Sequence, residues 1–163
     1  MADTKTISMP ANIITIGGGK GGIGKSVLFT NLAVGMALSG QDVILIDTDY
    51  GASNLHALLG IGNPRHGLVD FFSDKNSYSG SLLLDTGISN LKFLSGAGDN
   101  PGSADLPELQ NGKIMDFIRN LHADTILIDL GPGTSFSVLD YYNLGSQGVV
   151  VTIPEMPSVI FVT

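Results

Sequence analysis

Short runs of apolar residues, each closed by glycine or aspartate, recur along the chain and predict buried β-strands. We expect such strands at 12–16, 43–46, 91–94, 125–129 and 148–153. Within each run the apolar residues follow one another and do not alternate with polar ones, which is typical of strands covered on both faces. The pattern therefore predicts a mostly parallel sheet with helices on both faces.

The segments between these runs carry helical signals. Residues 25–39 are apolar on nearly every side and are followed by Gly40, a residue type that commonly ends helices, so we expect a buried helix there. Apolar residues at helical spacing predict an amphipathic helix over 108–122, namely Ile114, Phe117, Ile118 and Leu121. We also expect short helices at 55–59 and 138–144, a helical turn at 68–72 and a loop at 96–107. This alternation of strands and helices assigns the chain to the α/β class.

Length and composition agree with a single domain over residues 1–163. Apolar residues make up 43% of the chain and charged residues 14%, so it can build a substantial core. The net charge of −7 argues against direct nucleic-acid binding, which needs a basic face. The sequence has no cysteine, no apolar stretch long enough to cross a bilayer and no signal-peptide pattern. We therefore expect a cytoplasmic protein, with residues 1–10 flexible.

The first predicted strand leads into a glycine-rich loop with the pattern G-x-x-x-x-G-K-[ST]. The pattern is matched by Gly19, Lys20, Gly21, Gly22, Ile23, Gly24, Lys25 and Ser26. Glycines let the backbone N–H groups converge on phosphate oxygens, and the lysine ammonium adds a point charge to the β- and γ-phosphates. The Ser26 hydroxyl is a ligand type that suits Mg²⁺. We expect these residues, together with Val27, to bind a nucleotide.

Two other predicted strands end in carboxylates. Asp129 closes the strand at 125–129, and Asp47 and Asp49 follow the strand at 43–46. Ligands bind beyond the carboxyl ends of strands in open α/β sheets, so these side chains are predicted to lie beside the phosphate loop. There Asp129 would hold Mg²⁺ directly or through water, and the carboxylates of Asp47 and Asp49 can orient a water molecule and complete the outer shell of the metal. Gly131 would belong to a loop that senses a γ-phosphate.

The same glycines allow a second interpretation. Gly17, Gly19 and Gly22 also satisfy G-x-G-x-x-G, the dinucleotide-binding pattern, with Asp47 ending the next strand. In a glycine run this is a weak match, and it leaves the adjacent Lys25 and Ser26 without a role. The phosphate-loop hypothesis uses both residues and is the one that we favour.

The run from Lys20 to Ser26 resembles the deviant Walker A motif, K-G-G-x-G-K-[ST], of the MinD/ParA group of ATPases. Residues 45–51, Asn54 with Leu55, residues 126–133 and residues 151–155 are also similar to segments of that group. The similarity extends over most of residues 12–158, and the stretch 47–59 is most similar to the MinD-like and flagellar-placement members.

This resemblance implies a P-loop fold, ATP and Mg²⁺ as cofactors, and a homodimer in which two subunits enclose two ATP molecules. Lys20 would reach the phosphates of the partner subunit, while Lys25 and Ser26 would serve the nucleotide of their own subunit. Asp49 would position the attacking water, and Asn54 matches a position near the first switch of the family. Lys20, Lys25 and Asp49 are therefore the predicted catalytic residues of a slow ATPase that assembly or a protein partner stimulates.

Members of this group are longer than the present chain, so we expect these residues to form the N-terminal part of the family's domain. Membrane association would then depend on a region outside this sequence, and the identity of the protein partner is open. Three alternatives also stay open: an ATP-dependent iron–sulfur carrier, a metabolic P-loop enzyme that turns over without dimerising, and a nucleotide-binding module without catalysis.

Overall fold

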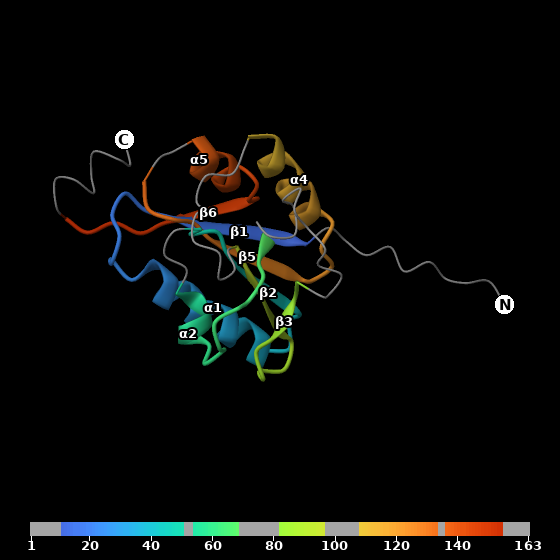
Figure 1. Ribbon diagram of the computed structural model, residues 1–163. Coiled ribbons are helices and arrows are strands. Elements are labelled where there is room, and N and C mark those ends of the chain that lie inside the picture. The colour runs from blue at the N-terminus through green and yellow to red at the C-terminus, as the bar shows by residue number, and fades with distance from the viewer. Residues whose placement is uncertain (1–10, 51–53, 69–81, 97–107, 134–135, 155–163) are drawn as a thin grey trace.

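The computed structural model describes residues 11–50, 54–68, 82–96, 108–133 and 136–154. Predictions for residues 1–10, for the helical turn beyond Leu68 and for the loop from 97 to 107 lie outside these described residues. Within the described part, strands and helices alternate as the sequence predicts (Figure 1).

The strands form one sheet in the order β3-β4-β2-β5-β1-β6. Their bounds are β1 Asn12–Gly17, β2 Val43–Asp47, β3 Leu84–Asp85, β4 Leu91–Ser95, β5 Thr125–Asp129 and β6 Gln147–Val150. Every neighbouring pair runs parallel except β3 with β4, which is antiparallel. The mostly parallel α/β sheet predicted from the sequence is confirmed. Strand β3 was not predicted, because its two residues are too few to show a pattern.

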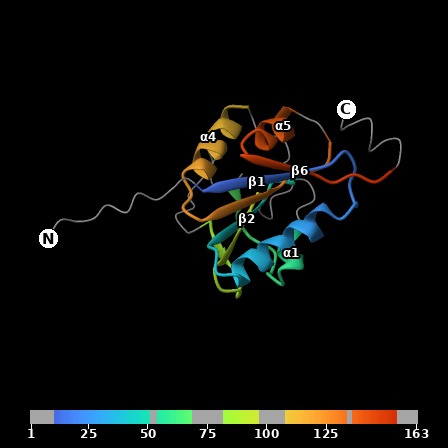
Figure 2. The same cartoon turned by 180° about the vertical axis from the view of Figure 1, so that it is seen from behind.

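The helices lie in two layers, one on each face of the sheet. Their bounds are α1 Lys25–Leu38, α2 Leu55–Leu58, α4 Glu108–Arg119 and α5 Phe136–Tyr142. Helices α4 and α5 cover one face and α1 and α2 the other, as both views show (Figures 1 and 2). The predicted starts of α1, α2 and α4 coincide with the observed ones, and the other predicted helix ends differ by one to three residues. None of the helices among the described residues is long and apolar enough to cross a membrane.

Successive residues of the central strands point to opposite faces and so feed two separate cores. On the α4–α5 side the core contains Ile44, Ile46, Ile126 and Ile128 from β2 and β5, with Ile114, Ile118 and Tyr141 from the helices. On the α1 side it contains Val43, Leu45 and Leu127 from the same strands, with Phe29, Ala33 and Ala37 from α1. Covering of both faces explains why the strands are apolar throughout.

One prediction for α1 is wrong. The sequence predicts a helix buried on all sides, yet Val27, Leu28, Leu32 and Leu38 are between 38% and 75% exposed. Only the face that carries Phe29, Ala33 and Ala37 contacts the sheet. A helix that is apolar all round gives no signal for which side will be covered, because that depends on its neighbours.

Strand β6 also differs slightly from its prediction. The apolar run at 148–153 predicts a strand of that length, whereas β6 covers Gln147–Val150. Its pairing with β1 ends where β1 ends, at Gly17 opposite Val150. A strand can extend only as far as its partner, which the sequence of the run itself does not reveal.

Candidate functional site

The carboxyl ends of β1, β2 and β5 meet at one edge of the sheet. Asp47 of β2 and Asp129 of β5 are paired in register, and Ile16 of β1 is the other partner of Asp129. The glycine-rich loop leaves β1 at this edge and leads into α1. The parallel pairing therefore brings the loop and the acidic residues together, as the sequence predicts.

Local backbone geometry explains the glycines of the loop. Gly22 and Gly24 have φ angles of 75° and 92°, a region that other residues rarely adopt. Gly18 lies close to the residue that follows β6. A Cβ at Gly18 would be 2.6 Å from the Val151 carbonyl oxygen. Gly24 caps α1 without any side-chain hydrogen bond, so the N–H groups of the first helical turn remain available for an anion.

Lys25 is held inside this loop. The residue is only 7% exposed, and its ammonium donates a hydrogen bond of 3.4 Å to the backbone carbonyl oxygen of Lys20. Burial of an ammonium group is costly unless an anion compensates for the charge. The position of Lys25 at the start of α1, directly after the glycine-rich loop, makes this loop a strong candidate for phosphate binding.

Asp129 lies opposite, at the end of β5. It is 3% exposed, one of its carboxylate oxygens (Oδ1) has no hydrogen-bond partner, and the Ser26 side chain hydrogen-bonds to the carboxyl group. The pKa of Asp129 is raised to about 6, chiefly by burial. The charges of Asp47 and Asp49 add to this shift, and the Ser26 hydrogen bond and the charge of Lys25 oppose it. A buried carboxylate oxygen without a partner, beside a serine hydroxyl, fits the ligand chemistry of Mg²⁺.

Asp47 has a different environment from Asp129. It is 1% exposed, and its two oxygens accept backbone N–H groups from Asp49 at 3.0 Å and from Leu55 at 3.3 Å. The carboxylate thus joins the loop after β2 to the start of α2. Its role in metal binding stays a prediction, whereas its role in shaping this loop is visible in the structure.

A cavity of about 490 Å³ connects these groups. Its lining residues are Gly21, Gly22, Gly24, Lys25, Ser26, Val27, Asp47, Asp49, Asn54, Ala57, Leu58, Asp129, Leu130 and Pro132. Its volume lies in the range of small-molecule sites. The described residues contain no group of three acidic or histidine side chains that could hold a metal ion.

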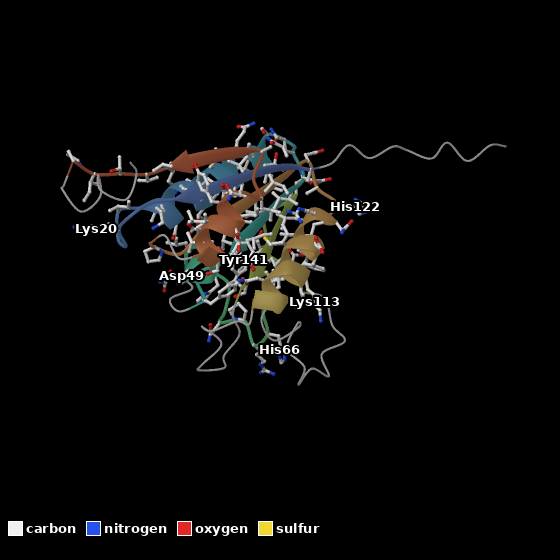
Figure 3. The ribbon with its side chains drawn as sticks, turned by 90° about the horizontal axis from the view of Figure 1, so that it is seen from above. Lys20, Asp49, His66, Lys113, His122 and Tyr141 are labelled. Carbon is white, nitrogen blue, oxygen red and sulfur yellow. The ribbon has the colours of Figure 1, made fainter. Side chains whose placement is uncertain are left out.

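Most of the predicted site residues line this cavity. The exceptions are Gly19, Lys20, Ile23 and Gly131. Lys20 is exposed on the loop, and Figure 3 shows it at the same end of the molecule as Asp49, with His122 at the opposite end. Gly131 lies just outside the cavity, where a Cβ would be 3.6 Å from the Asp49 carboxyl carbon.

Ala57 and Leu58 of α2 line the cavity but were not among the predicted site residues. Leu58 is 47% exposed and, with Val27 and Leu130, forms part of the apolar lining of the cavity. Helix α2 has only four residues, too few for a pattern that would show which side faces the cavity. Its attachment to Asp47 through the Leu55 N–H group places it there.

The glycine loop, the buried lysine and the strand-end carboxylates define a P-loop nucleotide-binding protein. Residues 14–151 match the model of the CobQ/CobB/MinD/ParA nucleotide binding domain, and the chain belongs to this family. Membership favours the phosphate-loop interpretation of the glycines over the dinucleotide pattern.

Three proteins illustrate the similarity. The septum site-determining protein MinD of Helicobacter pylori is 35% identical over 151 residues, covering 91% of this chain and 55% of its own length. The antiactivator FleN of Pseudomonas aeruginosa is 27% identical over 152 residues, covering 92% and 53%. The structure of MinD from Pyrococcus horikoshii complexed with Mg-ADP has a TM-score of 0.77 and 26% identity, covering 92% and 61%. The chain thus spans about half the length of the relatives it matches.

Proposed function

We propose that this chain binds and hydrolyses ATP with Mg²⁺ in the cytoplasm, and that it acts as a homodimerising switch of the MinD/ParA type. The observation that carries the proposal is that the glycine loop, Lys25, Ser26 and Asp129 line the same cavity. It offers cationic and N–H groups for phosphates and, beside them, a serine hydroxyl and an unpaired carboxylate oxygen for a metal ion. The Mg-ADP bound by the Pyrococcus horikoshii relative supports this choice of ligands.

Each side chain has a defined part in the proposed reaction. Lys25 and the N–H groups at the start of α1 bind and orient the phosphates. Ser26 and Asp129 would hold Mg²⁺, which neutralises charge on the phosphate oxygens. Asp49 lines the same cavity and orients the attacking water.

Lys20 supplies the dimer dependence. The residue is exposed, it is not among those that line the cavity, and its carbonyl oxygen accepts a hydrogen bond from the Lys25 ammonium. A lysine in this position can reach the phosphates of a second subunit, so that transition-state charge is compensated only after assembly. Hydrolysis would then release the dimer by removing the γ-phosphate that joins the two subunits.

The proposed target of the switch is a protein partner. Relatives are named for determining the septum site and for antiactivation, and both names describe regulation of other cellular components. The net charge of −7 disfavours direct binding of this chain to nucleic acid.

The test is a measurement of nucleotide binding and solution mass, with Mg²⁺ and a non-hydrolysable ATP analogue. The wild-type chain should bind the analogue and dimerise, Lys20→Ala should bind it and stay monomeric, and Lys25→Ala should lose at least tenfold in affinity through loss of a charge-assisted phosphate contact. His122→Ala, far from the cavity, is the control.

The results also separate the other hypotheses. Hydrolysis by a monomer would contradict the dimer switch and favour a metabolic enzyme, and binding without hydrolysis would favour a non-catalytic module. Failure of the wild-type chain to bind the analogue would overturn the proposal. An iron–sulfur carrier is disfavoured for this chain, because it has no cysteine to hold a cluster.

A further inference from the structure

A hydrogen-bonded network of hydroxyl and amide side chains crosses the apolar layer beneath α4 and α5. The hydroxyl groups of Tyr50 and Tyr141 are 2.7 Å apart, and Tyr141 donates a hydrogen bond of 3.2 Å to the Oδ1 atom of Asn111. A phenol has one hydrogen to donate, so Tyr141 accepts from Tyr50 when it donates to Asn111. The hydrogen-bonded network therefore connects the loop after β2 to α5 and then to α4.

The hydrogen-bonded network lies inside the core. Tyr141 is 2% exposed and Asn111 is 8% exposed, and Tyr141 lies among the apolar side chains of the α4–α5 layer. The two tyrosine rings meet edge to face, with centroids 6.4 Å apart. Burial raises the pKa of Tyr50 well above 10 and that of Tyr141 to about 12, so both phenols keep their protons. A buried hydroxyl pair of this kind costs free energy when either partner is removed.

Tyr50 is next to Asp49 in the sequence, so the tyrosine pair can affect the position of Asp49. Tyr50 directly follows Asp49, the predicted water-orienting residue. On the other side of Asp49, Thr48 donates its N–H and its hydroxyl to the Asp129 carbonyl oxygen, both at 2.9 Å. Asp49 is thus held between two anchors, one on β5 and one on the helix that follows β5.

Glycine at position 96 allows this arrangement. A Cβ there would lie 2.8 Å from the Tyr50 ring and would also collide with the Asp47 carbonyl oxygen. The ring of Tyr50 therefore packs directly on the backbone that follows β4. In Figure 3, Tyr141 is drawn between Asp49 and Lys113 of α4, consistent with its place in the middle of the hydrogen-bonded chain.

We propose that Tyr50 and Tyr141 are positioning residues, whose paired hydroxyls hold Asp49 in place against the β5–α5 segment. Through them the loop after β2 is connected to α5 and, by way of Asn111, to α4. The proposal rests on the function proposed above, since it assigns a purpose to the position of Asp49 in ATP hydrolysis.

The first arm of the test needs no nucleotide. Amide hydrogen exchange of residues 48–50 is compared in the wild-type chain, Tyr50→Phe, Tyr141→Phe and Tyr142→Phe. Tyr142 is the matched control, since it is the neighbouring tyrosine of α5 and lies against Gly17. Loss of the pair should speed exchange about fivefold or more in the first two variants, the effect of losing one hydrogen bond, and leave it unchanged in Tyr142→Phe. Unchanged exchange in both pair variants would overturn the proposal.

The second arm measures hydrolysis. The pair variants should lower kcat about threefold to tenfold while KM for ATP stays within about twofold, because Asp49 moves and the phosphate loop does not. The double variant should match the single ones, since either substitution already breaks the pair. An equal fall in the Tyr142→Phe control, or a rise in KM with kcat unchanged, would contradict a positioning role.

The two arms keep the proposals apart. If the wild-type chain neither binds nor hydrolyses ATP, the proposed function fails, and the exchange data alone uphold or overturn the hydroxyl connection. If it hydrolyses ATP and the pair variants match it in both arms, the proposed function stands and the positioning role is wrong.

Discussion

Asp129 is buried, which disfavours its ionised form, yet the proposed binding of Mg²⁺ requires the carboxyl group to be ionised. The carboxyl group is almost completely covered, and one of its oxygens has no hydrogen-bond partner. Its pKa is raised to about 6, mainly by burial and to a smaller extent by the charges of Asp47 and Asp49. Functional sites commonly retain such unfavourable groups, because the ligand that uses them compensates for their cost.

Asp129→Asn should therefore stabilise the ligand-free chain at neutral pH. The folded-state pKa of about 6 exceeds the reference value of 3.8, so the protonated carboxyl favours folding below pH 3.8 and this contribution is lost as the pH rises through 6. At pH 7.5 the variant should gain up to about 3 kcal/mol in free energy of unfolding, and near pH 3.5 the gain should vanish. Urea unfolding without Mg²⁺ or nucleotide at both pH values measures the difference.

The control for this experiment is Asp116→Asn on the surface of α4. Asp116 has a 73% exposed side chain and pairs with Arg119 at 3.1 Å, so its removal should change the free energy of unfolding by less than about 1 kcal/mol at either pH. Equal stability of wild-type and Asp129→Asn chains at pH 7.5 would show that the buried carboxylate carries no such cost.

Individual residues were predictable from the sequence where a local motif specified them. The phosphate loop and the strand-end aspartates have fixed spacings, and the cavity brings them together as predicted. The pairing of Tyr50 with Tyr141 was not predictable, because 91 positions separate them and neither carries a motif. The backbone hydrogen bonds that occupy Asp47 depend likewise on how the chain turns after β2.

At the level of elements, helix α1 illustrates what a hydrophobic pattern can and cannot predict. The length and position of the helix followed from the sequence, but the covered side did not. Phe29 is fully buried, whereas Leu38, nine residues later on the same helix, is 75% exposed.

Truncating these two side chains should have very different effects. Phe29→Ala should lower the free energy of unfolding by about 3–5 kcal/mol, since it leaves a cavity between α1 and the sheet. Leu38→Ala should change it by less than about 0.5 kcal/mol, because the leucine side chain is already in contact with water. Chemical unfolding of both variants tests the assignment, and a large loss of stability for Leu38→Ala would show that its side chain is covered in solution.

At the level of the whole molecule, the two cores share their strands. Ile44 of β2 belongs to one core and its neighbour Leu45 to the other, and the same holds for Ile126 and Leu127 of β5. Neither core can lose its packing without disturbing the sheet that supports the other. The apolar runs that form these strands were enough to predict the α/β class. The order of the strands could not be predicted, because it depends on pairing between distant segments.

Because of this sharing, the chain should unfold in a single cooperative transition. The protein has no tryptophan, and three of its four tyrosines, Tyr50, Tyr141 and Tyr142, pack on the α4–α5 side. Tyrosine absorbance therefore reports mainly on that core, while far-UV circular dichroism reports on all helices. The urea midpoints from the two signals should coincide. Separate midpoints would mean that the α1 layer and the α4–α5 layer unfold independently.

The aspartates at the ends of β2 and β5 have a further consequence. The two strands have nearly the same sequence, Asp-Val-Ile-Leu-Ile-Asp over 42–47 and Asp-Thr-Ile-Leu-Ile-Asp over 124–129. They pair in register, with Asp47 opposite Asp129 at one end and with the Asp42 N–H group donating to the Asp124 carboxylate at the other.

A slip of one residue would exchange the faces of one strand, and since both faces are apolar the core alone would oppose it only weakly. The aspartates mark where each strand must stop, because a shifted pairing would draw one of them between the helices and the sheet without a partner. Asp47 and Asp129, which line the proposed nucleotide site, therefore also help to fix the register between β2 and β5. A substitution at Asp47 or Asp129 would affect both the proposed phosphate chemistry and the alignment of β2 with β5.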